Sequence, residues 1–483
     1  MYEFKGDFLM SFMLRKKDVN SILENNKNAS VEKHLGAFDV TLMSIGATIG
    51  TGVMVLTGLV ASRDAGPAVV LSFIASAIVC ILVALCYAEF SSSIPSTGSA
   101  YAYIYVSLGE VVAHLIGWSL IIGYTLSTST VAGGWAAYFN SLLKEVGINL
   151  PSKLTTIPSQ GGIINLPAVF VVMLVTFLLS RGTKESKKIN NLMVIIKLAV
   201  IVLFVTVGVF YIKPSNWNPF MPFGVKGVFA GAASVFFAYT GFDAISTCAE
   251  EVKNPQKNLP LGIVASLTVC SIIYVIVCLV LTGVAHYTEL NVGDALSYAL
   301  STVGQGWAAS IISIGAVIGI IAVMLAYSYG GSRILFSMSR DGLLPKRFSK
   351  VNTATGVPVL STWALGIMSA LMTGLVDLKQ LADVANITLI GTFMLMAVSV
   401  VVLRKSQPNL KRNFKVPLVP ALPIFAAGCC LFLMFNLSKT TWIYYGIWQT
   451  IGAVIYFTYS KNHSLLNKEP KEFNTKTKIQ KTA

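Results

Sequence analysis

The residues of this chain that could bind a ligand lie in two glycine-containing interruptions of otherwise apolar segments. The first reads Ser44-Ile45-Gly46-Ala47-Thr48-Ile49-Gly50-Thr51-Gly52, and the second reads Phe237-Ala238-Tyr239-Thr240-Gly241-Phe242-Asp243. A glycine that interrupts a helix frees backbone N–H and C=O groups, and inside a bilayer such groups persist only where they line a cavity of the protein. We therefore predict helix breaks at Gly46, Gly50 and Gly241, with a binding site where the breaks meet.

The first break offers groups of both polarities. A helix that resumes after Gly50 begins with free N–H groups near Thr51 and Gly52, which carry partial positive charge and suit a carboxylate. The half-helix before the break ends with free carbonyls near Thr48, which suit an ammonium. Packing is the alternative interpretation of this segment, because Gly46 and Gly50 also have the small-xxx-small spacing of closely packed membrane helices.

The second break adds acceptors and an acid. Phe237, Ala238 and Thr240 can present further carbonyls to an ammonium, and the Phe237 ring could cover a ligand or belong to the core. Asp243 is an ionisable residue inside a membrane segment, which usually marks function. Its carboxylate could instead cap free N–H groups of the second half-helix. Together the two breaks predict a site for the α-carboxylate and α-ammonium of a free amino acid.

Lys197 is the remaining ionisable residue deep in an apolar run. It lies ~12 Å from Ile189 along a helix that rises 1.5 Å per residue, too deep for its side chain to reach the interface fully. A buried ammonium is costly, so it can release and regain a proton during a conformational cycle. We predict a proton-coupling role for Lys197; a permanently charged lysine bonded to backbone carbonyls is the alternative.

Membrane-spanning helices must hold these residues in place. The chain of 483 residues is 54% hydrophobic and only 12% charged, which is too few charges for a water-soluble surface. Twelve apolar segments approach or exceed the ~20 residues that a helix needs to cross a bilayer. Their cores are 37–61, 67–92, 102–143 (with a bend expected at Gly109), 164–181, 189–212, 228–249, 259–285, 306–337, 358–376, 380–403, 418–437 and 441–459. We expect an all-α integral membrane protein with twelve transmembrane helices.

The positions of the two breaks predict two copies of one plan. Helices one to five (37–212) and six to ten (228–403) each open with a broken helix, and an odd number of helices per copy inverts the second copy in the membrane. Helices eleven and twelve (418–459) lie outside this repeat. We expect a cytoplasmic N-terminal segment (1–36) and a cytoplasmic basic tail (460–483).

The net charge of +15 follows membrane topology rather than nucleic-acid binding. With both termini in the cytoplasm, most Lys and Arg residues fall on the cytoplasmic side, as the positive-inside rule requires, where they contact anionic membrane lipids. The seven cysteines lie in apolar segments without metal-site spacing to histidine. No nucleophile–base set or phosphate-binding loop is evident within the membrane segments. We therefore predict a non-enzymatic protein without a metal or cofactor.

Motifs occur in a characteristic order along residues 36 to about 350. They are Gly36-Ala37-Phe38-Asp39, Ile45 to Gly52, Ala88-Glu89-Phe90, Pro95-Ser96-Thr97-Gly98-Ser99-Ala100-Tyr101, Phe236 to Asp243, Glu250-Glu251-Val252-Lys253-Asn254-Pro255 and Ser339-Arg340-Asp341-Gly342-Leu343-Leu344-Pro345. In these motifs the chain resembles the amino acid–polyamine–organocation superfamily, in particular bacterial members of its cationic amino acid transporter family. The resemblance implies a five-plus-five inverted-repeat fold with helices one and six broken.

The resemblance also implies residue roles. A carbonyl of Thr48 and N–H groups of Thr51 and Gly52 would hold the substrate, and three residues of the sixth helix would complete the ammonium site: Phe237, Ala238 and Thr240. Lys197 matches the lysine that, in proton-coupled relatives, occupies the place of a sodium ion. The third helix departs from the pattern, because relatives commonly carry acids where this chain has Ser119 and Gly123.

A pocket or relay at Ser119, Gly123 and Asp243 would therefore contain little fixed negative charge, which favours a neutral substrate. We predict a bacterial plasma-membrane transporter that carries neutral L-amino acids together with protons. Amino acid exchange and import of cationic amino acids are the alternatives. A non-transporting amino acid sensor is a further possibility, although the terminal segments are too short for a folded signalling domain.

Overall fold

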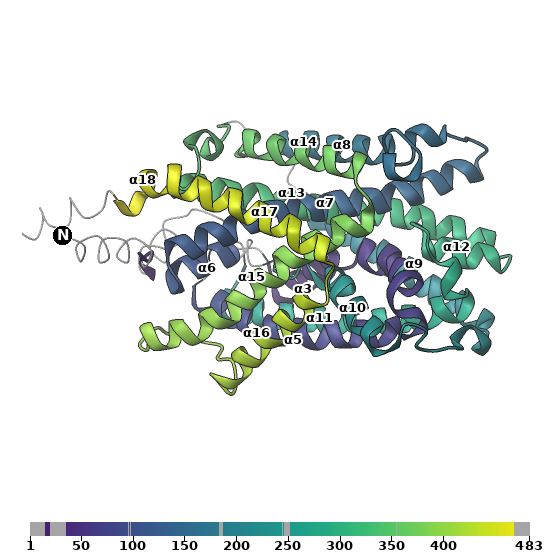
Figure 1. Cartoon of the computed structure of the whole chain (residues 1–483), viewed down its shortest axis with the longest axis horizontal. Helices are drawn as coiled ribbons and strands as arrows, with labels where there is room; N and C mark the ends of the chain where they lie inside the picture. Colours follow the sequence, from purple (N-terminus) through teal and green to yellow (C-terminus); the bar gives the residue numbers. More distant parts are fainter. Residues whose placement is uncertain are drawn as a thin grey trace, which may run out of the picture.

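The regular structure of the protein is helical. The computed structural model describes residues 15–19, 35–94, 96, 98–182, 187–243, 245, 252–353 and 355–467, and within them the only β-bridge recorded pairs Leu35 with Val252. Most of the expected N-terminal segment, the stretch 246–251 and the tail beyond residue 467 lie outside the described residues. The helices run along the long axis of the molecule in one bundle (Figure 1).

The first apolar segment is interrupted, as its glycines predict. Helix α3 (Ala37–Thr48) ends where Ile49 turns to an extended conformation with φ −75° and ψ 109°. The chain resumes as a π-helical turn, η1 (Gly52–Leu56), followed by α4 (Thr57–Val60) and η2 (Ala61–Ala65). The break therefore lies at Ile49 and Gly50. Gly46, predicted as a break, instead lies inside α3, one turn before it.

The third apolar segment divides at Gly109, where a bend was expected. Helix α6 (Ser99–Ser107) ends before this glycine, and the long helix α7 (Glu110–Glu145) begins after it. Gly109 has φ 99° and ψ 179°, a conformation that is essentially restricted to glycine. The sharp turn between the two helices therefore requires a residue without a side chain.

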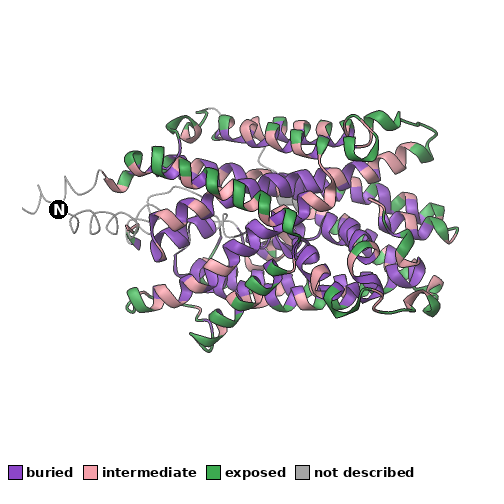
Figure 2. Cartoon of the chain, in the orientation of Figure 1, coloured by how far each residue is buried: buried purple, intermediate pink, exposed green. Residues whose placement is uncertain are grey.

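The remaining helices alternate with short connections. They are α5 (Val69–Ser93), α8 (Leu166–Ser180), α9 (Lys187–Gly208), α10 (Gly224–Val235) with the 3₁₀ turn η8 (Phe236–Tyr239), α11 (Pro255–Val284), α12 (Ala295–Thr302), α13 (Gly306–Arg340), α14 (Val359–Leu375), α15 (Leu378–Ser406), α16 (Ala421–Phe435), α17 (Lys439–Ile455) and α18 (Lys461–His463). Buried residues concentrate along the middle of the bundle (Figure 2), where α13 and α15 pack against α7.

Six helical stretches in the described residues are long and apolar enough to cross a membrane on their own: Gly52–Ser93, Glu110–Glu145, Asn191–Tyr211, Pro255–Val284, Gly306–Arg340 and Leu378–Ser406. The helix pair Ala421–Phe435 and Lys439–His463 passes the same criteria together but bends by 113°. Four shorter apolar helices are Ala37–Thr48, Leu166–Ser180, Gly224–Tyr239 and Val359–Leu375. The protein is thus a multi-pass membrane protein, and the count of twelve spans stays a prediction.

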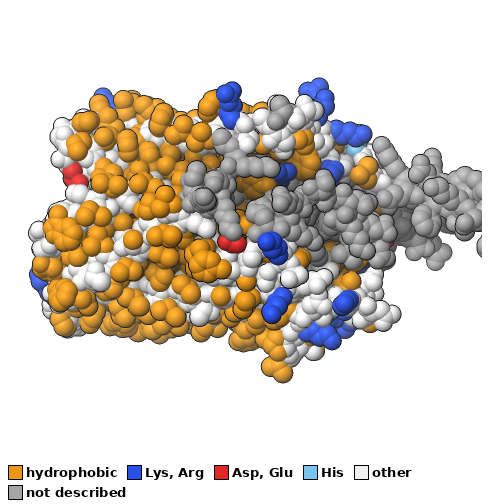
Figure 3. Space-filling view, turned by 180° about the vertical axis from the view of Figure 1, so that it is seen from behind, with side chains coloured by type: hydrophobic (Ala, Val, Ile, Leu, Met, Phe, Trp, Pro, Cys, Tyr) orange, Lys and Arg blue, Asp and Glu red, His pale blue; other side chains and the backbone are white. Residues whose placement is uncertain are grey.

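The surface separates into an apolar body and a basic end. Exposed aliphatic and aromatic side chains, among them Phe170, Phe425 and Ile443, cover the outer faces of the helices. Figure 3 shows this apolar surface over much of one face, with many of the visible Lys and Arg side chains toward its right-hand end. That end is the left-hand end of Figure 1, where α6 and α18 lie. Arg15 also hydrogen bonds to Asn467, so the first and last described residues lie at the same end of the molecule.

Candidate binding site

The two broken helices meet in the centre of the bundle, in direct backbone contact. A Cβ atom placed on Gly52 would lie 2.4 Å from the Ala238 Cα, and one placed on Gly241 would lie 2.7 Å from the Ala47 carbonyl oxygen. Gly241 also has φ +115°, where a side chain would strain the backbone. Glycine at both positions therefore lets the breaks approach each other. The structure thus brings together break residues that are almost 200 positions apart in the sequence.

A tyrosine hydroxyl joins the two breaks. The Tyr274 hydroxyl, from α11, lies 3.1 Å from the carbonyl oxygen of Thr48 and 2.8 Å from that of Ala238. These are two of the carbonyls predicted to receive the ammonium of a ligand. A phenol has one proton to donate, so it can satisfy only one of the two acceptors fully at any moment.

The other acceptors of the second break are held by the chain itself. The Phe237 carbonyl accepts hydrogen bonds from the Thr240 N–H (3.2 Å) and hydroxyl (2.7 Å). The Thr240 carbonyl accepts one from the Tyr327 hydroxyl at 3.1 Å. A ligand ammonium would therefore replace weak local donors rather than fill an unsatisfied gap, and the charge-assisted bonds that it makes are the stronger ones.

Two hydroxyls at the first break have no hydrogen-bond partner in the structure. They belong to Thr48 and Thr51, whose residues are only 3% and 0% exposed. An unpartnered buried hydroxyl is costly. Thr51 also packs against Gly134 of α7, where a Cβ would lie 2.5 Å from its methyl group. These hydroxyls thus mark the first break as a place where a polar ligand gains hydrogen bonds.

Lys197 reaches the first break from α9. Its ammonium lies 2.5 Å from the Gly46 carbonyl oxygen and 3.0 Å from that of Ile49. Its aliphatic stem lies against α13 at Gly319, where a Cβ would come within 2.1 Å of the Lys197 Cγ. Lys197 is fully buried. The ammonium therefore holds the end of α3 at the carbonyls that the break releases.

Asp243 is bonded through both carboxylate oxygens. One accepts the Gly241 N–H at 3.1 Å, and the other accepts the Tyr124 hydroxyl at 2.6 Å. The first bond is a local cap on the broken helix, the alternative role considered from the sequence. The second ties the break to α7. Most of the capacity of this carboxylate is therefore used within the protein.

Ser119 and Gly123 lie away from the two breaks. The Ser119 hydroxyl donates to the Leu115 carbonyl and accepts from the Gln449 amide of α17. A Cβ on Gly123 would meet the Thr388 hydroxyl of α15 at 2.6 Å. The expectation that these two residues line the pocket beside the breaks therefore needs correction. The next residue, Tyr124, points to Asp243 instead, because consecutive helical residues differ in direction by about 100°.

Three tyrosines of the site were missed from the sequence: Tyr124, Tyr274 and Tyr327. Each lies in an apolar segment, where an aromatic residue is ordinarily a packing residue. The available signal was that a buried tyrosine hydroxyl needs a partner, and the free carbonyls of the breaks are such partners. Only the packing of α7, α11 and α13 against the breaks identifies which tyrosines they are.

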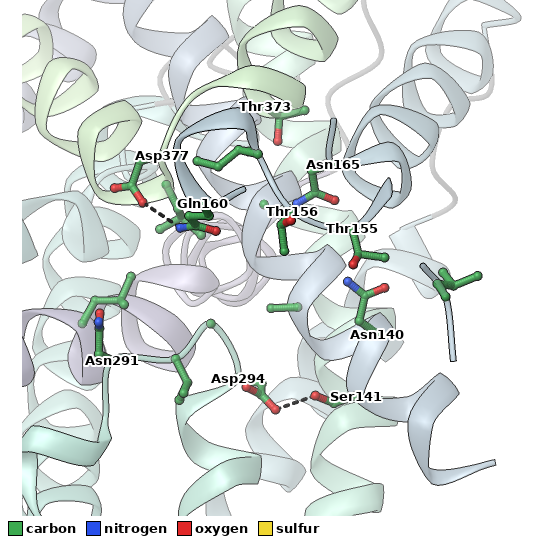
Figure 4. Close-up of a pocket in the computed structure, with 18 of the residues that line it drawn as sticks. Asn140, Ser141, Thr155, Thr156, Gln160, Asn165, Asn291, Asp294, Thr373 and Asp377 are labelled. Atoms are coloured by element: carbon green, nitrogen blue, oxygen red, sulfur yellow. Dashed lines mark hydrogen bonds between the residues drawn. The ribbon is translucent and has the colours of Figure 1, made fainter. Parts of the chain in front are cut away.

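A second feature is a cavity of about 380 Å³ at the end of the molecule that carries α12. Its walls include residues of the η2 turn, the end of α7, the loop before α12 and the start of α15. Figure 4 shows Ser141 bonded to Asp294 on one side and Gln160 bonded to Asp377 on another. Burial raises the pKa of the Asp294 carboxyl above its ordinary value, although the Ser141 hydrogen bond opposes this shift.

The chain matches a known protein family over most of its length. Residues 35–457 match the family described as amino acid permease. The chain belongs to this family, which is part of the amino acid–polyamine–organocation superfamily. It is a membrane transporter of the permease type rather than an enzyme, and the resemblance noted in the sequence is confirmed.

Several relatives are similar over nearly their whole length. A methylthioribose transporter of Bacillus subtilis is 50% identical and covers 95% of this permease and 100% of its own chain. A branched-chain amino acid permease of the same organism is 49% identical, with coverage of 94% and 99%. A vacuolar cationic amino acid transporter of Arabidopsis thaliana is 38% identical, with coverage of 83% and 68%.

Proposed function

We propose that this permease carries neutral L-amino acids with aliphatic side chains across the plasma membrane of a bacterium, driven by proton symport. The proposal depends chiefly on one observation, the direct contact between two helix breaks at Gly52–Ala238 and Gly241–Ala47. Backbone N–H groups near Thr51 and Gly52 would bind the α-carboxylate. Carbonyls of Thr48, Phe237, Ala238 and Thr240 would bind the α-ammonium. Every amino acid has these two groups, so this part of the site recognises the class.

The neighbours of the breaks favour a neutral side chain. Val323 packs against Gly50, and Phe237 and Tyr327 lie beside each other with ring centroids 6.2 Å apart. Asp243, the acid beside the second break, is bonded to Tyr124 and Gly241. A guanidinium or second ammonium would therefore meet apolar surface and an engaged carboxylate. Relatives 49% and 33% identical are named branched-chain amino acid permeases, which supports the same preference.

The topology that we propose has twelve transmembrane helices and two inverted repeats, 37–212 and 228–403. Helices eleven and twelve (418–459) would pack beside them, and membrane lipids would cover the exposed apolar faces. The N-terminal segment (1–36) and the tail (460–483) would both be cytoplasmic. The contact between Arg15 and Asn467 supports this placement, because an even number of crossings returns the chain to its starting side.

Uptake of labelled leucine into proteoliposomes tests the proposal. A pH gradient, acidic outside, should drive accumulation, and a protonophore should abolish it. Unlabelled valine and isoleucine should compete, whereas arginine and lysine should compete weakly. Strongest competition by arginine or lysine would contradict the neutral preference. Accumulation that needs internal amino acid but no proton gradient would indicate exchange, and binding without any flux would indicate a sensor.

Methylthioribose is the second candidate substrate, because a relative 50% identical is named its transporter. This sugar has ring hydroxyls but neither an ammonium nor a carboxylate. The unpartnered hydroxyls of Thr48 and Thr51 could bond such hydroxyls. Methylthioribose should be included in the same competition experiment. Inhibition of leucine uptake by methylthioribose at lower concentration than by valine would favour the sugar.

A further inference from the structure

The cavity near α12 has the size of a small-molecule site and lies apart from the helix breaks. Its volume of about 380 Å³ falls within the roughly 300–1,000 Å³ of ordinary ligand pockets. Its lining residues come from the η2 turn, the loops after α7 and before α12, and the ends of α14 and α15. In the proposed topology this end faces the outside of the cell, where the substrate arrives.

Charges of both signs surround the cavity. Arg63 lies 3.5 Å from an oxygen of Asp377 and donates a 2.8 Å hydrogen bond to Asn291. Asp294 accepts the Ser141 hydroxyl at 2.6 Å, and Lys144 contributes a second cation. A zwitterion presents one carboxylate and one ammonium, so it can pair with a guanidinium and a carboxylate of this wall at once. A ligand with a single net charge would leave one of these groups unmatched.

Asn140 supplies an acceptor that the protein leaves unused. Its side-chain oxygen is buried and has no hydrogen-bond partner in the structure, and it precedes Ser141, which is bonded to Asp294 (Figure 4). A buried acceptor without a donor costs about 1–3 kcal/mol. An ammonium placed between Asn140 and Asp294 would supply donors to both residues.

The rest of the lining is apolar and leads toward the first break. Leu59, Leu378 and Leu381 line the cavity together with Gly133 of α7. The next residue, Gly134, packs directly against Thr51 of the first break. The cavity is therefore one residue of α7 away from the site where the substrate's carboxylate would bind.

We propose that this cavity is a capture site for a zwitterionic amino acid with an aliphatic side chain. Arg63 binds the carboxylate, Asn140 and Asp294 bind the ammonium, and the leucines take the side chain. This inference rests on the proposed function, since it assigns the same substrate to a second site. A substrate molecule held here is positioned to enter the helix breaks when they open.

Equilibrium dialysis of labelled leucine against the purified full-length protein tests the inference. The wild type should bind two molecules of leucine per chain. Asn140→Leu should bind one, because it removes the unused acceptor and fills the space. Asp294→Asn keeps the shape and the Ser141 contact but removes the charge, and should weaken one site at least tenfold. Asn149→Leu is the matched control, because Asn149 is exposed in the same loop region and is not among the cavity-lining residues.

Gly52→Val separates the two sites, because it should remove binding at the breaks and leave one molecule bound in the cavity. A wild type that binds one leucine, lost completely in Gly52→Val and retained in both cavity variants, would overturn the inference while leaving the proposed function intact. A wild type that binds no leucine would overturn both. Melting temperatures close to that of the wild type show that Asn140→Leu is folded, and Asp294→Asn decides the question if it is not.

Discussion

At the scale of single residues, Gly52 limits how closely the two broken helices can approach. We expect Gly52→Val to abolish amino acid binding, because even a Cβ would overlap Ala238 at 2.4 Å and the larger side chain would fill the place of the carboxylate. Thermal-shift measurements with leucine are the check. Gly446→Val is the matched control, since a Cβ there meets nothing within 4 Å. A folded Gly52→Val protein with full leucine uptake would contradict this prediction.

Tyr274 competes with the ligand for the carbonyls of Thr48 and Ala238. We expect Tyr274→Phe to lower the melting temperature of the empty protein, because one hydrogen bond, worth about 0.5–1.5 kcal/mol, is lost there. The stabilisation caused by saturating leucine should become larger, since the ammonium then restores donors to both carbonyls. An unchanged ligand-induced shift in Tyr274→Phe would show that the ammonium binds elsewhere.

Lys197 ties α9 to the carbonyls of Gly46 and Ile49 at the end of α3. If its proton drives transport, loss of the proton releases this contact and lets the first helix move. Leucine uptake by the wild type should then rise as the external pH falls. Lys197→Ala should lose accumulation against a gradient while leucine exchange is retained. Proteoliposome uptake at several external pH values is the measurement, and a variant that still concentrates leucine with the wild-type pH dependence would remove Lys197 from coupling.

At the scale of elements, the turn between α6 and α7 depends on Gly109. Its φ of 99° is accessible to glycine and strained for other residues, at a cost of about 1–3 kcal/mol. We expect Gly109→Ala to lower the melting temperature by several degrees while leaving the affinity for leucine unchanged, because the turn is remote from the breaks. The control is Gly428→Ala, where a Cβ meets nothing within 4 Å. A large loss of leucine affinity would show that this turn positions the site.

The helices themselves were largely predictable, because apolar segments in a bilayer must satisfy their backbone groups internally. The break after Thr48 and the bend at Gly109 both follow from glycine, and both occur in the structure. The fine position of the first break was not predictable. Gly46 remains helical, and its carbonyl is bonded to Lys197, which comes from an element distant in the sequence.

At the scale of the whole molecule, the proposed topology places the two ends of the bundle on opposite sides of the membrane. Asn149, in the exposed loop after α7, should be outside, and Lys405, at the end of α15, should be inside. We expect a membrane-impermeant thiol reagent to label Asn149→Cys in intact cells and to label Lys405→Cys only after permeabilisation. The wild type is the control, since its described cysteines are mostly buried. Labelling of Lys405→Cys in intact cells would contradict the topology.

The sequence by itself determined the membrane class of the protein, the two helix breaks and the depth of Lys197, since these follow from local composition and from the cost of polar groups in lipid. Tertiary structure decided which side chains share the site. Helix packing turned Tyr124, Tyr274 and Tyr327 toward the breaks and turned Ser119 and Gly123 toward α17 and α15. The direction of a residue on a helix depends on how that helix rotates against its neighbours, and contacts between distant segments set this rotation.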